Sequence, residues 1–145
     1  MKNITKDDFE EWVFALSDKE EEFVNIFREE MNVDLDYSVD SLDYVEEWLL
    51  EKFKTKENLL SDENKDIFDL VVCYIGGVFR RNLEGHWEIG LNNEKNAYYR
   101  LPIVISENVP APISPHTLIT ASFSRNKGNF ISTVLKNTLK NKNSI

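Results

Sequence analysis

A chain of 145 residues with a hydrophobic fraction of 41% is long enough to bury a core as a single domain without a metal ion or a disulfide. Cys73 is the only cysteine, so an internal disulfide is excluded. No stretch approaches the roughly 18 apolar residues of a membrane-spanning helix, and the N-terminal residues lack the apolar core of a signal peptide. We therefore expect one domain over residues 1–145, located in the cytoplasm and without a membrane partner.

The net charge of −9 is distributed unevenly. Residues 1–70 carry 22 acidic and 8 basic side chains, whereas residues 71–145 carry 4 acidic and 9 basic ones. An acidic surface repels DNA, RNA and anionic lipid, so we expect no nucleic-acid partner. A basic protein partner suits this charge better, because complementary charge speeds encounter.

The first seventy residues predict helices separated by short breaks. Thr5 is typical of a helix N-cap, and apolar residues then recur at the spacing of one helix face. These are Phe9, Trp12, Val13 and Leu16. Ser17-Asp18 interrupts this helix and caps a second, which is expected to turn Phe23 and Phe27 inward and Glu20–Glu22 outward.

Residues 33–39 alternate apolar and polar side chains. This pattern predicts either a half-buried strand or an extended connection with an acidic outer row. Asp40 or Ser41 then caps a third helix with Leu42 and Leu49 on its inner face. Pairs of carboxylates such as Glu46-Glu47 are interpreted as exposed helix faces.

Residues 64–83 predict a long helix that is apolar on most of its circumference and must be covered on several sides. Gly76 and Gly77 inside it cost about 1 kcal/mol each relative to alanine. They therefore predict the close approach of another element, or a kink. Gly85 is placed to follow the helix as its left-handed C′ residue.

Residues 86–91 and 98–105 alternate in the same way and predict a hairpin with a turn at 92–96. The Ser114-Pro115 pair predicts the start of a further helix, and residues 129–142 predict a last amphipathic one. The expected fold class is α+β, a mostly helical single domain with a small antiparallel sheet packed on the central buried helix.

Two groups of polar residues are candidate sites. The first is an acidic partner-binding face, comprising Glu20, Glu21, Glu22, Asp34, Asp36 and Asp40. The second is a ligand-binding group at the helix-to-strand junction, comprising Arg80, Arg81, His86, Trp87 and Glu88. At this junction the arginines would clamp a carboxylate or phosphate and the tryptophan would supply an aromatic wall. Its structural alternative is helix capping and salt bridges between elements.

No residue pattern predicts a catalytic site, a metal site or a cofactor. The two histidines, His86 and His116, lack partners at metal-ligand spacing, and no phosphate-binding loop is present. Cys73 lies in an apolar run, where a buried and inert thiol is expected.

The stretch Tyr74-Ile-Gly-Gly-Val-Phe-Arg-Arg-Asn-Leu-Glu-Gly-His-Trp87 resembles a pattern in uncharacterised small bacterial domains. That pattern has Tyr-Leu/Ile-Gly-Glu, one or two arginines, and a glycine followed closely by tryptophan, and residues 41–48 resemble the helix that precedes it. Some of these domains look like immunity proteins encoded near toxin systems. Gly77 stands where the pattern has glutamate, and the resemblance implies no catalytic residue.

These observations predict a non-catalytic binding protein, with an immunity-type or antitoxin-like inhibitor of a basic toxin as its most concrete form. The acidic face would contact the partner. The alternative is a small ligand-binding domain or enzyme that uses the junction. A homo-oligomer formed through the C-terminal helix is a further expectation.

Overall fold

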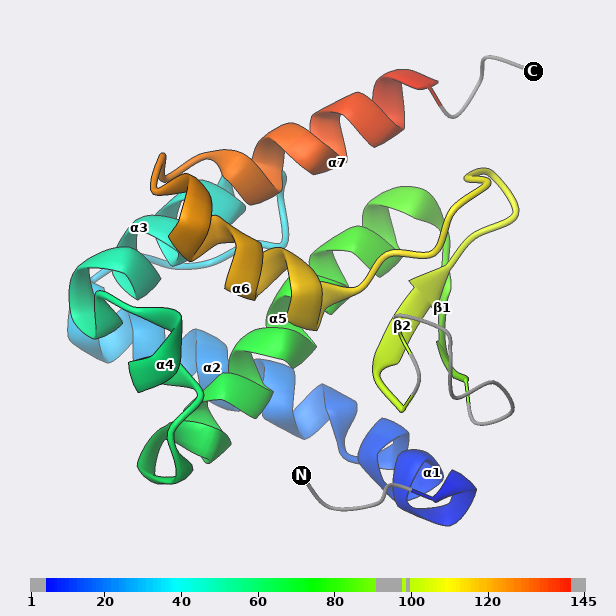
Figure 1. The fold of residues 1–145 in the computed structure, drawn as a ribbon, viewed down its shortest axis with the longest axis horizontal. Helices are drawn as coiled ribbons and strands as arrows, with labels where there is room; N and C mark the ends of the chain where they lie inside the picture. The colour runs from blue at the N-terminus through cyan, green and yellow to red at the C-terminus, as the bar shows by residue number, and fades with distance from the viewer. Residues whose placement is uncertain (1–4, 91–97, 99, 142–145) are drawn as a thin grey trace.

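The computed structural model describes residues 5–90, 98 and 100–141 and shows a mostly helical α+β fold (Figure 1). Its helices are α1 (Lys6–Phe14), α2 (Leu16–Met31), α3 (Ser41–Phe53), α4 (Lys56–Leu59), the 3-10 helix η1 (Asp62–Asn64), α5 (Lys65–Leu83), α6 (Pro115–Arg125) and α7 (Phe130–Asn141). Strands β1 (His86–Ile89) and β2 (Pro102–Ile105) pair antiparallel, with Trp87 opposite Val104. The predicted fold class is confirmed. Over these residues, no helix combines the length and the apolar character needed to cross a bilayer.

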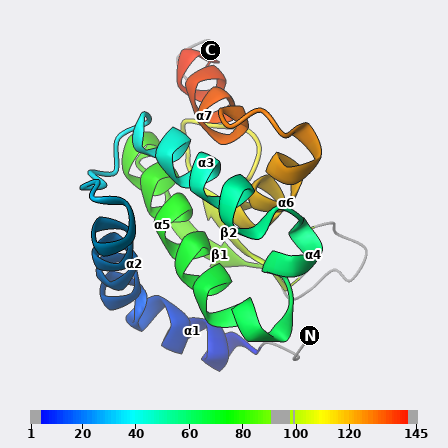
Figure 2. The same ribbon diagram turned by 90° about the vertical axis from the view of Figure 1, so that its left-hand side faces the viewer.

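Helix α5 is the centre of the fold, as its apolar circumference predicts. It contacts α2, α6, α7 and β2, and Figure 2 shows it running between α2 on one side and α3 and α6 on the other. Every residue from Leu70 to Phe79 is buried. Each large aliphatic side chain contributes about 1.5–3 kcal/mol when fully buried, so this run makes a large contribution to apolar stabilisation.

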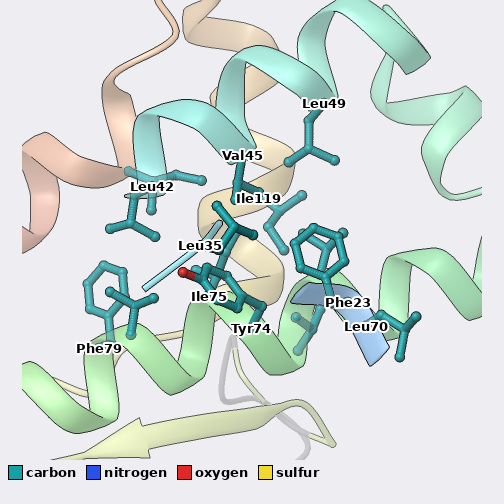
Figure 3. Close-up of a cluster of buried hydrophobic side chains, with 14 of the residues drawn as sticks. Phe23, Leu35, Leu42, Val45, Leu49, Leu70, Tyr74, Ile75, Phe79 and Ile119 are labelled. Atoms are coloured by element: carbon teal, nitrogen blue, oxygen red, sulfur yellow. The ribbon is translucent and has the colours of Figure 1, made fainter. Parts of the chain in front are cut away.

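The core between α3 and α5 is built from residues that the helical spacing places inward. Figure 3 shows Val45 and Leu49 pointing from α3 toward Tyr74 and Ile75 of α5, and all four are fully buried. Cys73 lies in the same run with no exposed surface, and burial raises the pKa of its thiol. The prediction of a buried thiol is confirmed, and the raised pKa agrees with low reactivity.

Each of the two glycines of α5 leaves space for the side chain of a different neighbouring element. A Cβ at Gly76 would collide with the Trp87 indole, and a Cβ at Gly77 would collide with the Glu20 carboxylate. The predicted close approach is therefore confirmed at both positions. Gly76 allows β1 to pack closely against α5, and Gly77 allows α2 to do so.

Gly85 does follow α5, but it is not the left-handed residue that was predicted to end the helix. Glu84, with φ of 55°, takes the left-handed conformation that ends α5. Gly85 is needed because a Cβ there would lie 2.8 Å from the carbonyl oxygen of Ile105 in β2. Its N–H donates to the carbonyl oxygen of Arg80 at 2.9 Å, so the chain turns tightly from α5 into the sheet.

Residues 32–40 form an irregular connection, so the strand predicted as one alternative for 33–39 is not formed. The backbone there is bound by side chains and not by a neighbouring strand. Tyr37, with φ of 64°, donates its N–H to Tyr74 Oη at 3.0 Å. Tyr74 Oη in turn donates to Ser41 Oγ at 2.8 Å, and burial raises the pKa of Tyr74 to about 12.

The returning strand of the hairpin is shorter than predicted. The Leu101 N–H donates to the carbonyl oxygen of Tyr98 at 2.9 Å, and Arg100 has φ of 66°, so this stretch is a turn and the returning strand begins at Pro102. The turn predicted at 92–96 lies outside the described residues. The break between the first two helices falls at Ala15, before the predicted Ser17-Asp18.

Candidate functional site

The C-terminal end of α5, the start of β1 and the turn between α1 and α2 enclose an open groove of about 470 Å³, which we call the junction groove. Four of the five residues predicted at the junction line it, namely Arg80, Arg81, His86 and Trp87. Glu88, the fifth, does not line it. Its Oε1 lies 3.7 Å from His86 Nε2 on the exposed face of the strand.

The opposite wall of the junction groove is apolar and comes from the turn between the first two helices. It consists of Val13, Phe14 and Leu16, and Ser17 and Glu20 of α2 line the groove beside them. Phe14 is 93% exposed and Val13 is 38% exposed, although Val13 was expected to face inward with the rest of its helical stripe. Phe9, Trp12 and Leu16 of that stripe do pack in or against the core, so the difference is confined to Val13. Sequence reasoning missed this wall.

Glu20 is not on the surface, so its predicted place in the acidic face is wrong. It is 5% exposed, and its Oε1 lies 2.9 Å from Arg81 Nη2. The space above Gly77 receives this carboxylate. The Arg81 guanidinium also stacks 3.8 Å from the centroid of the Tyr37 ring. Arg81 therefore has the structural role that was the alternative for the junction.

Arg80 differs from its neighbour. Its side chain is half-buried in the lining of the junction groove. Within residues 5–90, 98 and 100–141 it forms neither a hydrogen bond nor an ion pair. Because Arg81 is neutralised by Glu20, Arg80 is the cation of this groove that is left for a ligand.

Trp87 is the most buried member of the predicted junction set, with 8% exposure. It packs over Gly76 and edge-on against Trp12, at 4.8 Å between ring centroids. Its indole Nε1 is buried and has no hydrogen-bond partner in the described part of the chain. The other buried indoles do have acceptors, since Trp12 Nε1 donates to Asp69 at 2.8 Å and Trp48 Nε1 to Glu30 at 3.0 Å.

The rest of the predicted acidic face is exposed but dispersed. Glu21 and Glu22 lie on α2, while Asp34, Asp36 and Asp40 lie on the connection to α3, and all five are exposed. Two of them already have partners inside the chain. Asp34 pairs with Arg28, and hydrogen bonds from Ser38 lower the pKa of Asp36.

A more continuous acidic surface follows α3 itself, and we call it the α3 ridge. It consists of Asp40, Asp43, Glu47 and Glu51. None of these carboxylates forms an ion pair with any described residue. Tyr44, 53% exposed, lies among them. Hollows of about 270 and 370 Å³ flank Glu47, and the spacing along one helix face is a signal that sequence reasoning missed.

Glu46, next to the ridge in sequence, is fully buried, so its interpretation as part of an exposed pair is wrong. Its carboxylate accepts the backbone N–H of Phe130 at 3.0 Å and of Ile131 at 2.8 Å, at the start of α7. Burial raises its pKa, against the effect of these N–H donors. Glu46 therefore fixes α7 to α3 and is not available to a partner.

Helix α7 uses its apolar face inside the chain. Ile131 and Leu135 are buried, and Val134 and Leu139 pack against the core. Self-association through this helix stays a prediction, and a second copy would meet mainly its polar side chains. Among the described residues, no group of three or more histidine, cysteine, aspartate or glutamate side chains is arranged to hold a metal ion.

No family model, curated protein or solved structure matches this chain. The resemblance of residues 41–48 and 74–87 to small bacterial domains therefore stays a prediction. The candidate sites depend on the geometry described above.

Proposed function

We propose that this chain is a non-catalytic binding protein whose α3 ridge contacts a basic protein partner. The observation that carries the proposal is the row of four carboxylates without a basic counterpart among the described residues. Since the whole chain carries a net charge of −9, a basic partner would be attracted at long range and then oriented by the ridge.

The shape of the α3 ridge supports protein recognition. Tyr44 offers an exposed aromatic ring within the row of carboxylates, and tyrosine is among the residues that contribute most at interfaces. The hollow on one side of Glu47 is lined by three carboxylates and Tyr44, whereas the hollow on the other side is lined by Glu47 and Glu51 together with Lys127. The first hollow could receive a lysine or arginine side chain of the partner.

An immunity-type inhibitor of a basic toxin is the most specific form of this proposal, and it agrees with the resemblance to domains encoded near toxin systems. The proposal includes a cytoplasmic location. The unpaired and buried thiol of Cys73 is in keeping with a reducing compartment.

The test is titration of the full chain with the basic product of a neighbouring gene, at low and at physiological salt. Reversal of the ridge by Glu47→Lys with Glu51→Lys is expected to weaken binding by about tenfold or more. Glu57→Lys with Glu63→Lys is the matched control, because it changes the charge equally at exposed positions outside α3. Equal affinity of the ridge and control variants would contradict the proposal.

A second candidate function is ligand binding at the junction groove. The observation that favours it is the convergence of Arg80, Arg81, His86 and Trp87 on one concave surface. The groove lies beside α1 and β1, at a different end of the molecule from α3 (Figures 1 and 2). The two functions can therefore be tested independently.

A further inference from the structure

We propose that the junction groove binds a carboxylate of a partner protein, belonging to an acidic residue that stands next to an apolar side chain. The inference rests on the second candidate function and not on the α3 ridge. It follows from three residues that line this groove, which carry a guanidinium without an ion pair, a buried indole N–H without an acceptor and an exposed phenyl ring.

The guanidinium of Arg80 supplies the charge. The Arg81 guanidinium is already held by Glu20 at 2.9 Å and donates to the carbonyl oxygen of Gly77 at 3.2 Å. Arg80 lines the same groove without an ion pair in the described part of the chain. A planar guanidinium matches a carboxylate with two parallel hydrogen bonds, so Arg80 favours this anion.

The indole of Trp87 supplies an unused donor. Of the three tryptophans, Trp12 and Trp48 donate to carboxylates of the chain, and Trp87 alone lacks an acceptor among the described residues. Buried donors in native proteins are nearly always paired, and an unpaired one is costly. The Nε1 atom is itself buried, so a carboxylate bound to Arg80 would reach it only after the indole shifts toward the groove. A carboxylate has enough acceptor positions for both donors.

The phenyl ring of Phe14 indicates that the ligand is more than an anion. It is 93% exposed at the edge of the groove, beside Val13. An inorganic anion would leave this apolar wall in water, whereas a peptide would cover it while its carboxylate reached Arg80. The combination of arginine and aromatic side chains around an open groove is typical of protein interfaces.

The test follows the indole N–H signals of the three tryptophans by NMR while the full chain is titrated with peptides. The probe is acetyl-Gly-Phe-Glu-Gly-amide, and acetyl-Gly-Phe-Gln-Gly-amide is its neutral match. We expect the Trp87 signal to move with the acidic peptide, because its N–H gains an acceptor. The Trp12 and Trp48 signals should stay in place, because their acceptors lie within the chain.

Variants then assign the contacts. Arg80→Gln is expected to lower the affinity for the acidic peptide by about tenfold, so that the acidic peptide no longer binds more tightly than the neutral one. Phe14→Ala should weaken both peptides by a similar factor, whereas Arg125→Gln, on α6, should leave both affinities unchanged. Glu47→Lys on the α3 ridge should also leave them unchanged, which separates failure of this inference from failure of the ridge.

Three results would overturn the inference. The first is a Trp87 signal that stays fixed during titration with the acidic peptide. The second is equal affinity of Arg80→Gln and the unmodified chain. The third is tighter binding of free 3-phenylpropionate than of the acidic peptide, since this would assign the groove to a small acid and not to a protein partner.

Discussion

Glu46 and Glu47 are adjacent on α3, yet one carboxylate is buried and the other is exposed. The inner one accepts two N–H groups at the start of α7. The outer one belongs to the α3 ridge and has no ion pair with a described residue. Helical geometry separates them, because consecutive residues on a helix do not share a face. A charge count therefore cannot distinguish acids that hold a fold from acids that are free for a partner.

The two faces of α3 differ in what compensates their charge. The inner carboxylate loses its hydration, and the N–H donors and positive end of the α7 dipole offset that loss. The outer carboxylates keep their hydration, and their cost is mutual repulsion along the helix. Changes at the two faces should therefore have opposite effects on stability.

The largest effect is expected from Glu46→Ala. It leaves the N–H groups of Phe130 and Ile131 without an acceptor, so the free energy of unfolding should fall by about 3 kcal/mol. Urea denaturation measures the loss. Glu47→Ala is the matched control on the other face and should change the free energy of unfolding by no more than about 0.5 kcal/mol. A loss as large as that of Glu46→Ala would show that the inner and outer carboxylates do not differ in structural role.

The next effect is on the pH dependence of stability. Because burial raises the pKa of Glu46 above its unfolded-state value, the folded chain binds this proton more tightly than the unfolded chain does. The contribution of Glu46 to the free energy of unfolding should therefore fall as pH rises from the unfolded-state pKa through the folded-state pKa. Glu46→Gln lacks this titration, and the difference between the two denaturation series isolates it. A difference that increased with pH over this interval would show that the N–H donors outweigh burial.

Asp43 lies between the two faces and should show an intermediate effect. Ser132 Oγ donates to its carboxylate at 2.6 Å, which ties the ridge to α7. A double-mutant cycle with Asp43→Ala and Ser132→Ala should give a coupling energy of about 1.5 kcal/mol, as for a single hydrogen bond to a charged group. No measurable coupling would place Asp43 entirely on the outer face.

The smallest effect is expected on the ridge itself. Glu47→Gln relieves repulsion with Asp43 and Glu51, one turn away on either side, so it should raise the free energy of unfolding by about 0.3 kcal/mol. Added salt should remove this gain, because it screens exposed charges. Precise thermal unfolding at two salt concentrations measures it, and a loss of stability on neutralisation would mean that Glu47 has a structural partner.

Much of the fold was predictable because it depends on local patterns. The apolar circumference of α5 gave its central place, and Ser114 with Pro115 gave the start of α6. The cationic side of the junction groove was equally accessible, since Arg80 and Trp87 are close in sequence. Each of these predictions needed only one segment of the chain.

The remainder depends on contacts between distant segments. The pairing of Glu20 with Arg81 joins α2 to α5, and that of Glu46 with Ile131 joins α3 to α7. The bare backbone at Gly77 indicated that something would approach but not which side chain would fill the space. Phe14 lies outside the apolar stripe of its helix, and its place beside Arg80 was missed because it depends on how α1 packs against α5 and β1.

The position of Cys73 makes its rate of chemical modification a measure of how often the core opens. The thiol is 0% exposed in the middle of α5, and burial holds it in the unreactive protonated form. A thiol reagent can therefore modify the chain only while the central helix is transiently released from its neighbours. Since this is the only cysteine, the rate at which a single mass increment appears reports how often the core opens. Any ligand of the intact fold would slow that rate without the introduction of a label.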